Sequence, residues 1–190
     1  MNLLAVDTTS DQIVLALYKE GSSDYFVGEK GAKKHNSVLL NDVDGFLQKN
    51  DLSINDIDVF GAVVGPGSFT GIRIGVSTVN ALAISLGKKT VSVTSLEVPV
   101  QEGEDALVAL DCKHDNYYCG LFKSGNATYF PLTRSEIEKN DEKKIFLDGV
   151  YPRELLDKCV KKALAGDFCG QAKPFYMKRS SAERETGILC

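Results

Sequence analysis

The pattern of apolar and polar residues along the N-terminal half predicts strands first. The segments LLAVD and IVLALYKEG are typical of two strands joined by the polar turn TTSD, and DYFVGEKG is a candidate for a third. DIDVFGAVVG is almost continuously apolar, which indicates a central strand covered on both faces. KTVSVTSLEV supplies the next strand.

Two stretches between these strands predict helices. Apolar residues recur at helical spacing in SVLLNDVDGFLQKN, so a helix is expected over about residues 37–48. A second helix is expected over residues 71–86, directly after a glycine-rich segment. The resulting order β-β-β-α-β-α-β predicts a mixed sheet with helices on its faces.

The second half repeats the opening of the first. When the sequence is shifted by 104 positions without a gap, LAVDTTSDQIVLALYKEG aligns with VALDCKHDNYYCGLFKSG. Any two hairpins share alternation and turn residues, but here an aspartate, the turn length and a closing Lys-x-Gly all agree, which favours a duplicated lobe. We expect an N-terminal lobe over residues 1–98 and a smaller C-terminal lobe over residues 99–190. The residues that align are Ala5, Asp7, Asp11, Leu17, Lys19 and Gly21 with Ala109, Asp111, Asp115, Leu121, Lys123 and Gly125.

The rest of the second half continues the pattern. ATYFPL and KKIFLDGV are predicted strands, and TRSEIEKN is a predicted short helix. PRELLDKCVKKALAG has Pro152 at a first helical position and Gly166 just past the end, which marks a helix. Its expected buried stripe is Leu155, Leu156, Cys159, Val160, Ala163 and Leu164.

Composition limits the classes of function. The chain has 190 residues, 43% of them hydrophobic and 25% charged, with a net charge of -4 that argues against a chain-wide electrostatic grip on nucleic acid. Its five cysteines form no C-x-x-C pair, so neither a zinc site nor a disulfide framework is indicated. The start, MNLLAVDTTS, lacks the basic leader of a signal peptide, and no apolar run approaches the roughly 20 residues of a membrane span. We therefore expect a reduced, cytoplasmic protein with no membrane partner.

The glycine-rich segment VVGPGSFTGIRIGVSTVNALA invites a test for a phosphate-binding loop. A Walker motif fails because Thr70 stands where its second glycine belongs and Gly71 where the next position needs lysine. A dinucleotide fingerprint is matched by Gly65 and Gly67, but its third glycine comes one place late. A nucleophile elbow around Ser68 fails as well, because its flanking positions are proline and threonine.

A packing role explains the same glycines better. Pro66-Gly67 is a turn pair, and Ser68 or Thr70 can cap the helix that follows. Gly71 and Gly75 then lie one turn apart inside the helix, where each costs about 1 kcal/mol relative to alanine. Such a cost requires close approach by another backbone, either from the chain's own sheet or from a helix of a partner chain. Arg73 would project from the same first turn as a fixed charge.

The segment GPGSFTGIRIGVSTVNALA, preceded by LLAVDTTS, closely resembles the TsaB (YeaZ) family of bacterial tRNA-modification proteins. The resemblance extends through VTSLE, ALDCKHDNYYCGLF and KPFYMKR, and so covers nearly the whole chain. It implies the two-lobe α/β fold of the actin-like ATPases (ASKHA, ribonuclease H-like), with duplicated mixed sheets flanked by helices. It also implies a non-catalytic scaffold for threonylcarbamoylation of tRNA adenosine at N6, the t6A37 modification.

The same resemblance implies partners. The family binds and activates a homologous catalytic subunit, TsaD, together with the ATPase TsaE, and its first two helices form the partner interface. No cofactor is expected on this chain alone; ATP or ADP and tRNA would be reached through the complex, and the chain could homodimerise when alone. The expected interface residues are Val38, Leu39, Val43, Phe46, Leu47, Gly71 and Gly75. Some of the five apolar residues must instead cover the chain's own sheet, and the sequence does not divide them.

A vestigial nucleotide turn is the second expected site, formed by Asp7, Thr8, Thr9, Gly65 and Gly67. Nucleotide-binding members of the superfamily have an Asp-x-Gly-type turn here, whereas this chain replaces the glycine by a branched residue. Asp7 can organise the turn as a cap or hold a metal-bound water, and the capping role is favoured.

Histidines give little support for a metal site or for hydrolysis. The catalytic relative carries H-x-x-x-H, but here His35 is followed by Leu39 at the second position, so no His-based metal site is expected. A glycoprotease-like peptidase is disfavoured because Cys112 and His114, two residues apart near a hairpin turn, specify no positioned nucleophile and base. A stand-alone ATP-binding or sugar-kinase-like enzyme is the remaining alternative, and tight ATP binding by the isolated protein would favour it.

Overall fold

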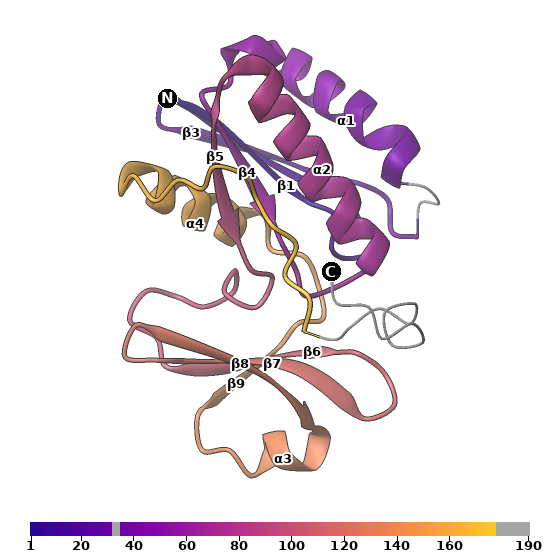
Figure 1. The fold of residues 1–190 in the computed structure, drawn as a ribbon, viewed down its shortest axis with the longest axis vertical. Helices are drawn as coiled ribbons and strands as arrows, with labels where there is room; N and C mark the ends of the chain where they lie inside the picture. Colours follow the sequence, from indigo (N-terminus) through magenta and orange to yellow (C-terminus); the bar gives the residue numbers. More distant parts are fainter. Residues whose placement is uncertain (32–34, 178–190) are drawn as a thin grey trace.

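Two β-sheets, one from each half of the sequence, organise the computed structural model, which describes residues 1–31 and 35–177 (Figure 1). The first sheet has the order β3-β2-β1-β4-β5 and the second β8-β7-β6-β9. The strands of the first sheet are β1 (Asn2–Asp7), β2 (Val14–Lys19), β3 (Ser22–Val27), β4 (Val59–Val63) and β5 (Lys89–Val93). Those of the second are β6 (Ala106–Asp111), β7 (Asn116–Lys123), β8 (Asn126–Thr133) and β9 (Lys143–Phe146).

Within the described residues, four α-helices flank the sheets, close to the ranges that the sequence predicts. They are α1 (His35–Lys49), α2 (Phe69–Leu86), α3 (Arg134–Glu138) and α4 (Pro152–Leu164), and a short 3-10 helix covers Ile54–Asp56. The expected two-lobe α/β architecture with duplicated mixed sheets is confirmed.

The duplication extends to individual hydrogen bonds. In each lobe a central strand pairs antiparallel with the next strand and parallel with a later one: β1 with β2 and β4, and β6 with β7 and β9. The first turns match too, because Asp7 Oδ1 accepts a hydrogen bond from the Thr9 amide at 2.7 Å and Asp111 Oδ1 accepts one from the Lys113 amide at 2.7 Å. Asp7 and Asp111, the two acceptors, are 104 positions apart, and so are Thr9 and Lys113, the two donors, as the sequence repeat requires.

The first sheet is the middle layer of three. Because side chains alternate across a strand, Leu4, Val6 and Leu15 face α1 and α2, while Leu3, Ala5 and Val14 face α4. Figure 1 shows the two long helices on one side of this sheet and α4 on the other. Burial on both faces explains why β4 is apolar throughout.

Helix α4 belongs by packing to the first lobe, although it follows the second sheet in sequence. Its residues Leu155, Leu156, Cys159 and Ala163 are buried against the first sheet. Gly61 of β4 permits this contact, since a Cβ there would lie 2.8 Å from Cys159 Sγ. The expected division at residues 98 and 99 therefore separates the two sheets but does not follow the packing of α4.

Two members of the predicted stripe of α4 differ from expectation. Leu164 is 74% exposed and Val160 is only partly buried, whereas Ala163 in the same last turn as Leu164 is buried, so the stripe that faces the sheet is narrower than predicted. Complete burial raises the pKa of the Cys159 thiol to about 12, so this thiol stays neutral and serves packing.

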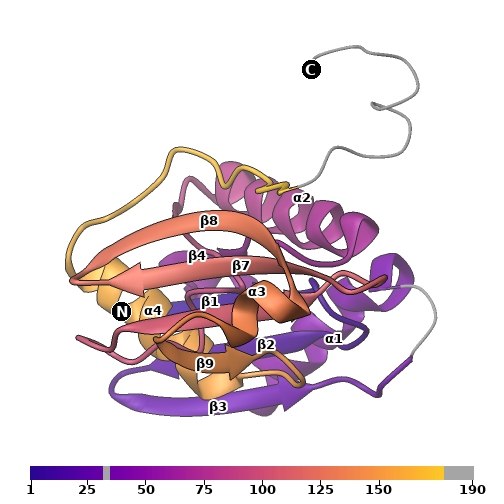
Figure 2. The same ribbon diagram turned by 90° about the horizontal axis from the view of Figure 1, so that it is seen from below.

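The second sheet presents one face to the first lobe and carries α3 on the other (Figure 2). Leu96, Val100 and Val108 form the core between the lobes, whereas Ile137 of α3 packs with Leu107 and other residues on the outer face.

The segment after α4 returns across the first lobe and joins it to the second. The Cys169 amide donates to the Thr90 carbonyl at 2.9 Å, and Ala172 exchanges two hydrogen bonds with the Asn80 side chain. The Phe175 amide then donates to the Val64 carbonyl at 2.8 Å, while its ring lies 5.0 Å from that of Tyr129 in the second sheet. We call residues 168–177 the C-terminal strap; the sequence offered no periodicity from which to predict it.

The assignment of α4 to the first lobe predicts different effects for two leucines on that helix. Leu156→Ala should lower the free energy of unfolding by about 2–5 kcal/mol, because it leaves a cavity against the first sheet. Leu164→Ala should change it by no more than about 0.5 kcal/mol, since that side chain is already exposed. Urea denaturation of both variants measures this. Equal effects of the two substitutions would contradict the packing described.

Candidate functional site

The strongest cluster of sequence-predicted residues lies where α2 begins. Ser68 caps the helix, its Oγ accepting a hydrogen bond from the Gly71 amide at 3.2 Å, and Gly87 ends it with a left-handed φ of 63°. The capping role that the sequence left open between Ser68 and Thr70 therefore belongs to Ser68. This start places the first turns of α2 directly beside the turn after β1.

The glycines of α2 allow the helix to touch that turn. Thr8 Oγ1 donates to the Gly71 carbonyl at 2.7 Å, and the Ser68 amide donates to the Thr9 carbonyl at 2.7 Å. A Cβ at position 71 would collide with the Thr8 carbonyl oxygen, and one at position 75 with the Thr8 hydroxyl. The close approach predicted from Gly71 and Gly75 is therefore made by the chain's own first turn.

This finding corrects the expected partner interface. Gly71 and Gly75 are buried inside the chain and cannot meet a partner helix. The apolar face of α1 is also used internally: Leu39, Val43, Phe46 and Leu47 are 1%, 3%, 4% and 1% exposed in the core of the first lobe, and Val38 packs at its edge. Helical spacing is the same for a face that covers a sheet and a face that binds a partner, so the sequence could not separate them.

Four residues of the expected nucleotide turn, Asp7, Thr8, Thr9 and Gly67, come together, whereas Gly65 lies against Ile72 and the Phe175 carbonyl. Asp7 Oδ1 accepts hydrogen bonds at 2.7 Å from both the amide and the hydroxyl of Thr9, which is the capping role favoured for this aspartate. Gly67 lies against the same turn, because a Cβ on it would be 2.5 Å from the Thr9 carbonyl. Gly65 adopts a φ of 108°, which favours glycine.

The turn is poorly suited to hold a phosphate. Phosphate loops present free backbone amides to the anion. Here the Thr9 amide is occupied by Asp7, and the side chains of Thr8 and Thr9 are 1% and 7% exposed. Helix α2 therefore covers one side of the turn, and Asp7 occupies the Thr9 amide that a phosphate would need.

A cleft of about 230 Å³ lies between the lobes next to this turn. It is smaller than the roughly 300–1,000 Å³ of most small-molecule sites. Its lining contains three carboxylates, those of Asp7, Asp11 and Asp148, and a single lysine, Lys30, so negative charge outnumbers positive charge. Burial raises the pKa of Tyr151, which also lines the cleft, and so keeps its hydroxyl protonated. The charge of the lining disfavours an anionic ligand.

The remaining candidates are the residues considered for a metal site or for hydrolysis. Among the described residues, no set of three or more His, Cys, Asp or Glu side chains is placed to hold a metal ion. His35 begins α1, but its side chain lies outside the described part, and Leu39 is buried. The Cys112 thiol donates to the Asn116 carbonyl at 3.2 Å, and His114 is exposed in the same turn.

The sequence interpretation missed the two large apolar residues that α1 and α2 present at the surface. Leu40 is 58% exposed and Ile84 60% exposed, one on each helix and both on the same side of the first sheet. By length and composition alone the 18 residues of α2 could cross a membrane, contrary to the expectation from the sequence, but a core helix of a soluble protein passes the same test. The apolar composition of α2 does not by itself tell which of its positions reach solvent, so the sequence carried no signal for Ile84.

Comparison with known proteins gives consistent matches. The family model of TsaD, the tRNA N6-adenosine threonylcarbamoyltransferase, matches residues 22–165. The chain is 32% identical over 132 residues to the tRNA threonylcarbamoyladenosine biosynthesis protein TsaB of Bacillus subtilis, covering 66% of this chain and 57% of that protein. It is 32% identical over 111 residues to the tRNA N6-adenosine threonylcarbamoyltransferase of Kosmotoga olearia, covering 50% and 34%. The chain spans about half the length of the curated relatives it matches.

A solved structure shares the fold. A Pseudomonas aeruginosa protein with similarity to the peptidase YeaZ superposes with a TM-score of 0.77 at 24% identity, covering 93% of this chain and 99% of that one. Together with the duplicated sheets, this likeness confirms the expected two-lobe α/β fold.

The contact between α2 and the first turn predicts a non-additive pair of substitutions. Gly75→Ala should lower the free energy of unfolding by about 1–3 kcal/mol, because the new Cβ meets the Thr8 hydroxyl. In a Thr8→Ala background the same substitution should cost clearly less, since the obstructing atom is gone. Gly45→Ala on α1 is the control, because nothing lies within 4 Å of its Cβ position, and it should be neutral or stabilising. Strictly additive unfolding energies would contradict the contact.

Proposed function

The chain belongs to the tRNA N6-adenosine threonylcarbamoyltransferase (TsaD) family, among its TsaB/YeaZ members, and from this premise we propose that it is a non-catalytic subunit of the tRNA threonylcarbamoyladenosine machinery. In this role it binds and activates a TsaD-like catalytic subunit together with a TsaE-like ATPase in the cytoplasm. ATP or ADP and tRNA are bound through the complex.

The closed first turn carries this proposal. A catalytic member of an ATPase fold needs backbone amides that approach phosphate between the lobes. In this chain the Thr9 amide is bonded to Asp7 and the Thr8 side chain is buried under Gly71 and Gly75. Opening the turn would break these hydrogen bonds and uncover the start of α2, so nucleotide binding would compete with the packing of the first lobe.

The outward side of α1 and α2 is the proposed partner surface. The proposed surface lies on the same two helices that the family resemblance implies. It consists of their solvent-exposed residues and not of the buried residues that were expected from the sequence. We define it by Leu40 of α1 and by Ser77, Ala81 and Ile84 of α2. Small and apolar residues on an exposed helix suit close packing against helices of another subunit. Two copies of the same face could also pair, which would give a homodimer when the partner is missing.

The closed turn predicts that the isolated chain does not bind ATP tightly. Isothermal titration with ATP and Mg²⁺ should show no binding with a dissociation constant below about 1 mM, because the lining of the cleft is acidic and its volume small. Micromolar affinity would instead support the alternative of a stand-alone ATP-binding or sugar-kinase-like enzyme.

The partner surface predicts a selective loss of association. Ile84→Glu should weaken binding to the TsaD-like subunit of the same organism by at least about ten-fold, because it places a charge at the centre of an apolar contact. Leu164→Glu is the matched control on α4, on the opposite side of the first sheet, and should bind as the wild type does. Surface plasmon resonance measures both, and threonylcarbamoylation by the reconstituted complex should fall only for Ile84→Glu. Equal binding by both variants would contradict the proposed surface.

A further inference from the structure

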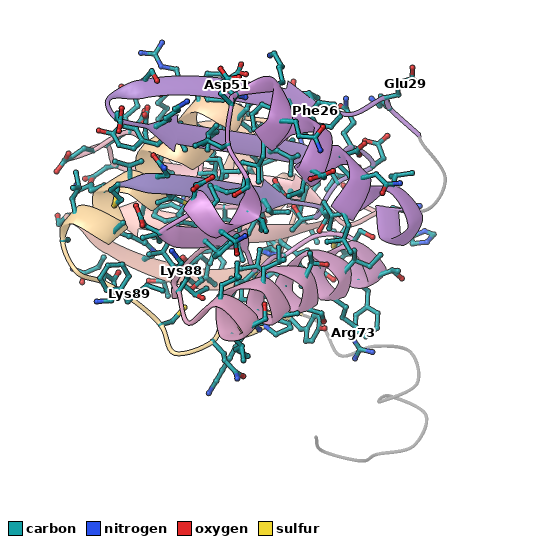
Figure 3. All side chains as sticks on the ribbon, turned by 90° about the horizontal axis from the view of Figure 1, so that it is seen from above. Phe26, Glu29, Asp51, Arg73, Lys88 and Lys89 are labelled. Atoms are coloured by element: carbon teal, nitrogen blue, oxygen red, sulfur yellow. The ribbon has the colours of Figure 1, made fainter. Side chains whose placement is uncertain are left out.

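Arg73 is held in one position at the exposed start of α2. Its guanidinium carbon lies 4.1 Å from the centroid of the Phe69 ring and 5.9 Å from that of Tyr176. Its Nε donates a hydrogen bond to the Tyr176 hydroxyl at 3.0 Å, and the two rings are 5.0 Å apart. Figure 3 shows Arg73 projecting from one end of α2, with Lys88 and Lys89 near the other end. The C-terminal strap thus orients a side chain of the helix that carries the proposed partner surface.

This arrangement leaves the Nη atoms available. A guanidinium can donate hydrogen bonds from its Nη groups in a fixed fork that matches a carboxylate. Within residues 1–31 and 35–177, no ion pair involves Arg73, and Tyr176 accepts from Nε only. The side chain is therefore stacked and oriented without a carboxylate partner in the described chain.

Arg134 is a second arginine that stacks on an aromatic ring, and it also has a carboxylate partner. Its guanidinium carbon lies 4.4 Å from the centroid of the Phe146 ring, a stacking distance close to that of Arg73 on Phe69. Arg134 Nε, however, also pairs with Glu138 Oε1 at 3.0 Å, one helical turn further on. The equivalent position relative to Arg73 is occupied by Ser77, which cannot supply the charge. Any carboxylate that pairs with Arg73 therefore lies outside the described residues.

The surroundings favour a protein carboxylate over an RNA phosphate. Arg73 is the only charged residue among the 18 residues of α2, whose exposed positions are otherwise small or apolar. Proteins that hold an RNA backbone use several cations, because each contact neutralises one phosphate. Interfaces between proteins are enriched in arginine and aromatic residues, the combination that Arg73, Phe69 and Tyr176 present.

We propose that Arg73 receives an aspartate or glutamate carboxylate of the catalytic subunit in a bidentate pair at the edge of the partner surface. The inference rests on the proposed function, since it assigns a specific contact within that association. Phe69 and Tyr176 already restrict the Arg73 guanidinium to one orientation, so the arginine side chain loses little conformational entropy on binding. The strap then contributes to partner recognition through Tyr176 without needing to touch the partner.

The test is a set of binding measurements with the full chain and the TsaD-like subunit. Arg73→Gln should weaken association by roughly thirty-fold or more, and Arg73→Lys by about ten-fold, because lysine keeps the charge but loses the fork. Tyr176→Phe keeps the ring stack and removes only the hydroxyl, so a loss of about three-fold is expected. Raising the salt concentration should weaken the wild type more than Arg73→Gln.

Lys89→Gln is the matched control. Lys89 is also an exposed cation over an aromatic ring, 4.3 Å from the centroid of Phe168, but it lies away from the proposed contact. It should bind like the wild type. Thermal melts of all four variants establish that each is folded, and Tyr176→Phe gives an independent measurement should Arg73→Gln fail that check.

The outcomes separate this inference from the proposed function. If the wild type does not bind the TsaD-like subunit, the proposed function is overturned, and this contact with it. If the wild type binds and Arg73→Gln binds equally well, only the assignment of Arg73 is overturned. If Arg73→Gln leaves subunit affinity unchanged but reduces retention of tRNA by the complex, the cation serves RNA, and the carboxylate assignment is again wrong. Restored affinity when Arg73→Glu is paired with a lysine at one acidic position of the partner would establish the contact.

Discussion

The close approach between α2 and the turn after β1 is the constraint on which the rest of the structure depends. Thr8 Oγ1 bonds to the Gly71 carbonyl, and the absence of side chains at positions 71 and 75 leaves room for the threonine. This contact fixes where α2 lies on the first sheet. It therefore decides which residues of the helix are buried and which remain at the surface.

The same contact closes the first turn of a fold whose strand order is otherwise duplicated. The two lobes keep the strand order, the pairing and even the aspartate-capped first turn of a duplicated fold. In the first lobe, however, the turn is filled by branched side chains and covered by a helix. The turn after β1 is therefore part of the packing between helix and sheet, which is compatible with the proposed role of a subunit that acts through contacts with other proteins.

Segments distant in sequence complete the surface that this packing creates. Helix α4 covers the far side of the first sheet, and the C-terminal strap returns over α2 to place Tyr176 against Arg73. Phe175 of the same strap contacts both Val64 in the first lobe and Tyr129 in the second. The orientation of the lobes and the exposed end of α2 are thus connected through three consecutive strap residues, 175–177, the last of which packs in the core between the lobes.

The sequence by itself determined the secondary structure, the duplication and the family, because these follow from local periodicity, turn chemistry and a specific glycine pattern. It also indicated that Gly71 and Gly75 serve close packing, since glycines inside a helix carry a cost that needs a compensating contact. Only the tertiary structure decided that this contact is Thr8, that Leu39 and Phe46 face the sheet, and that Leu40 and Ile84 face outward. The physical reason is that helical spacing defines an apolar face but not what covers it, whereas the placement of α4 and of the strap arises from contacts between residues more than sixty positions apart in the sequence.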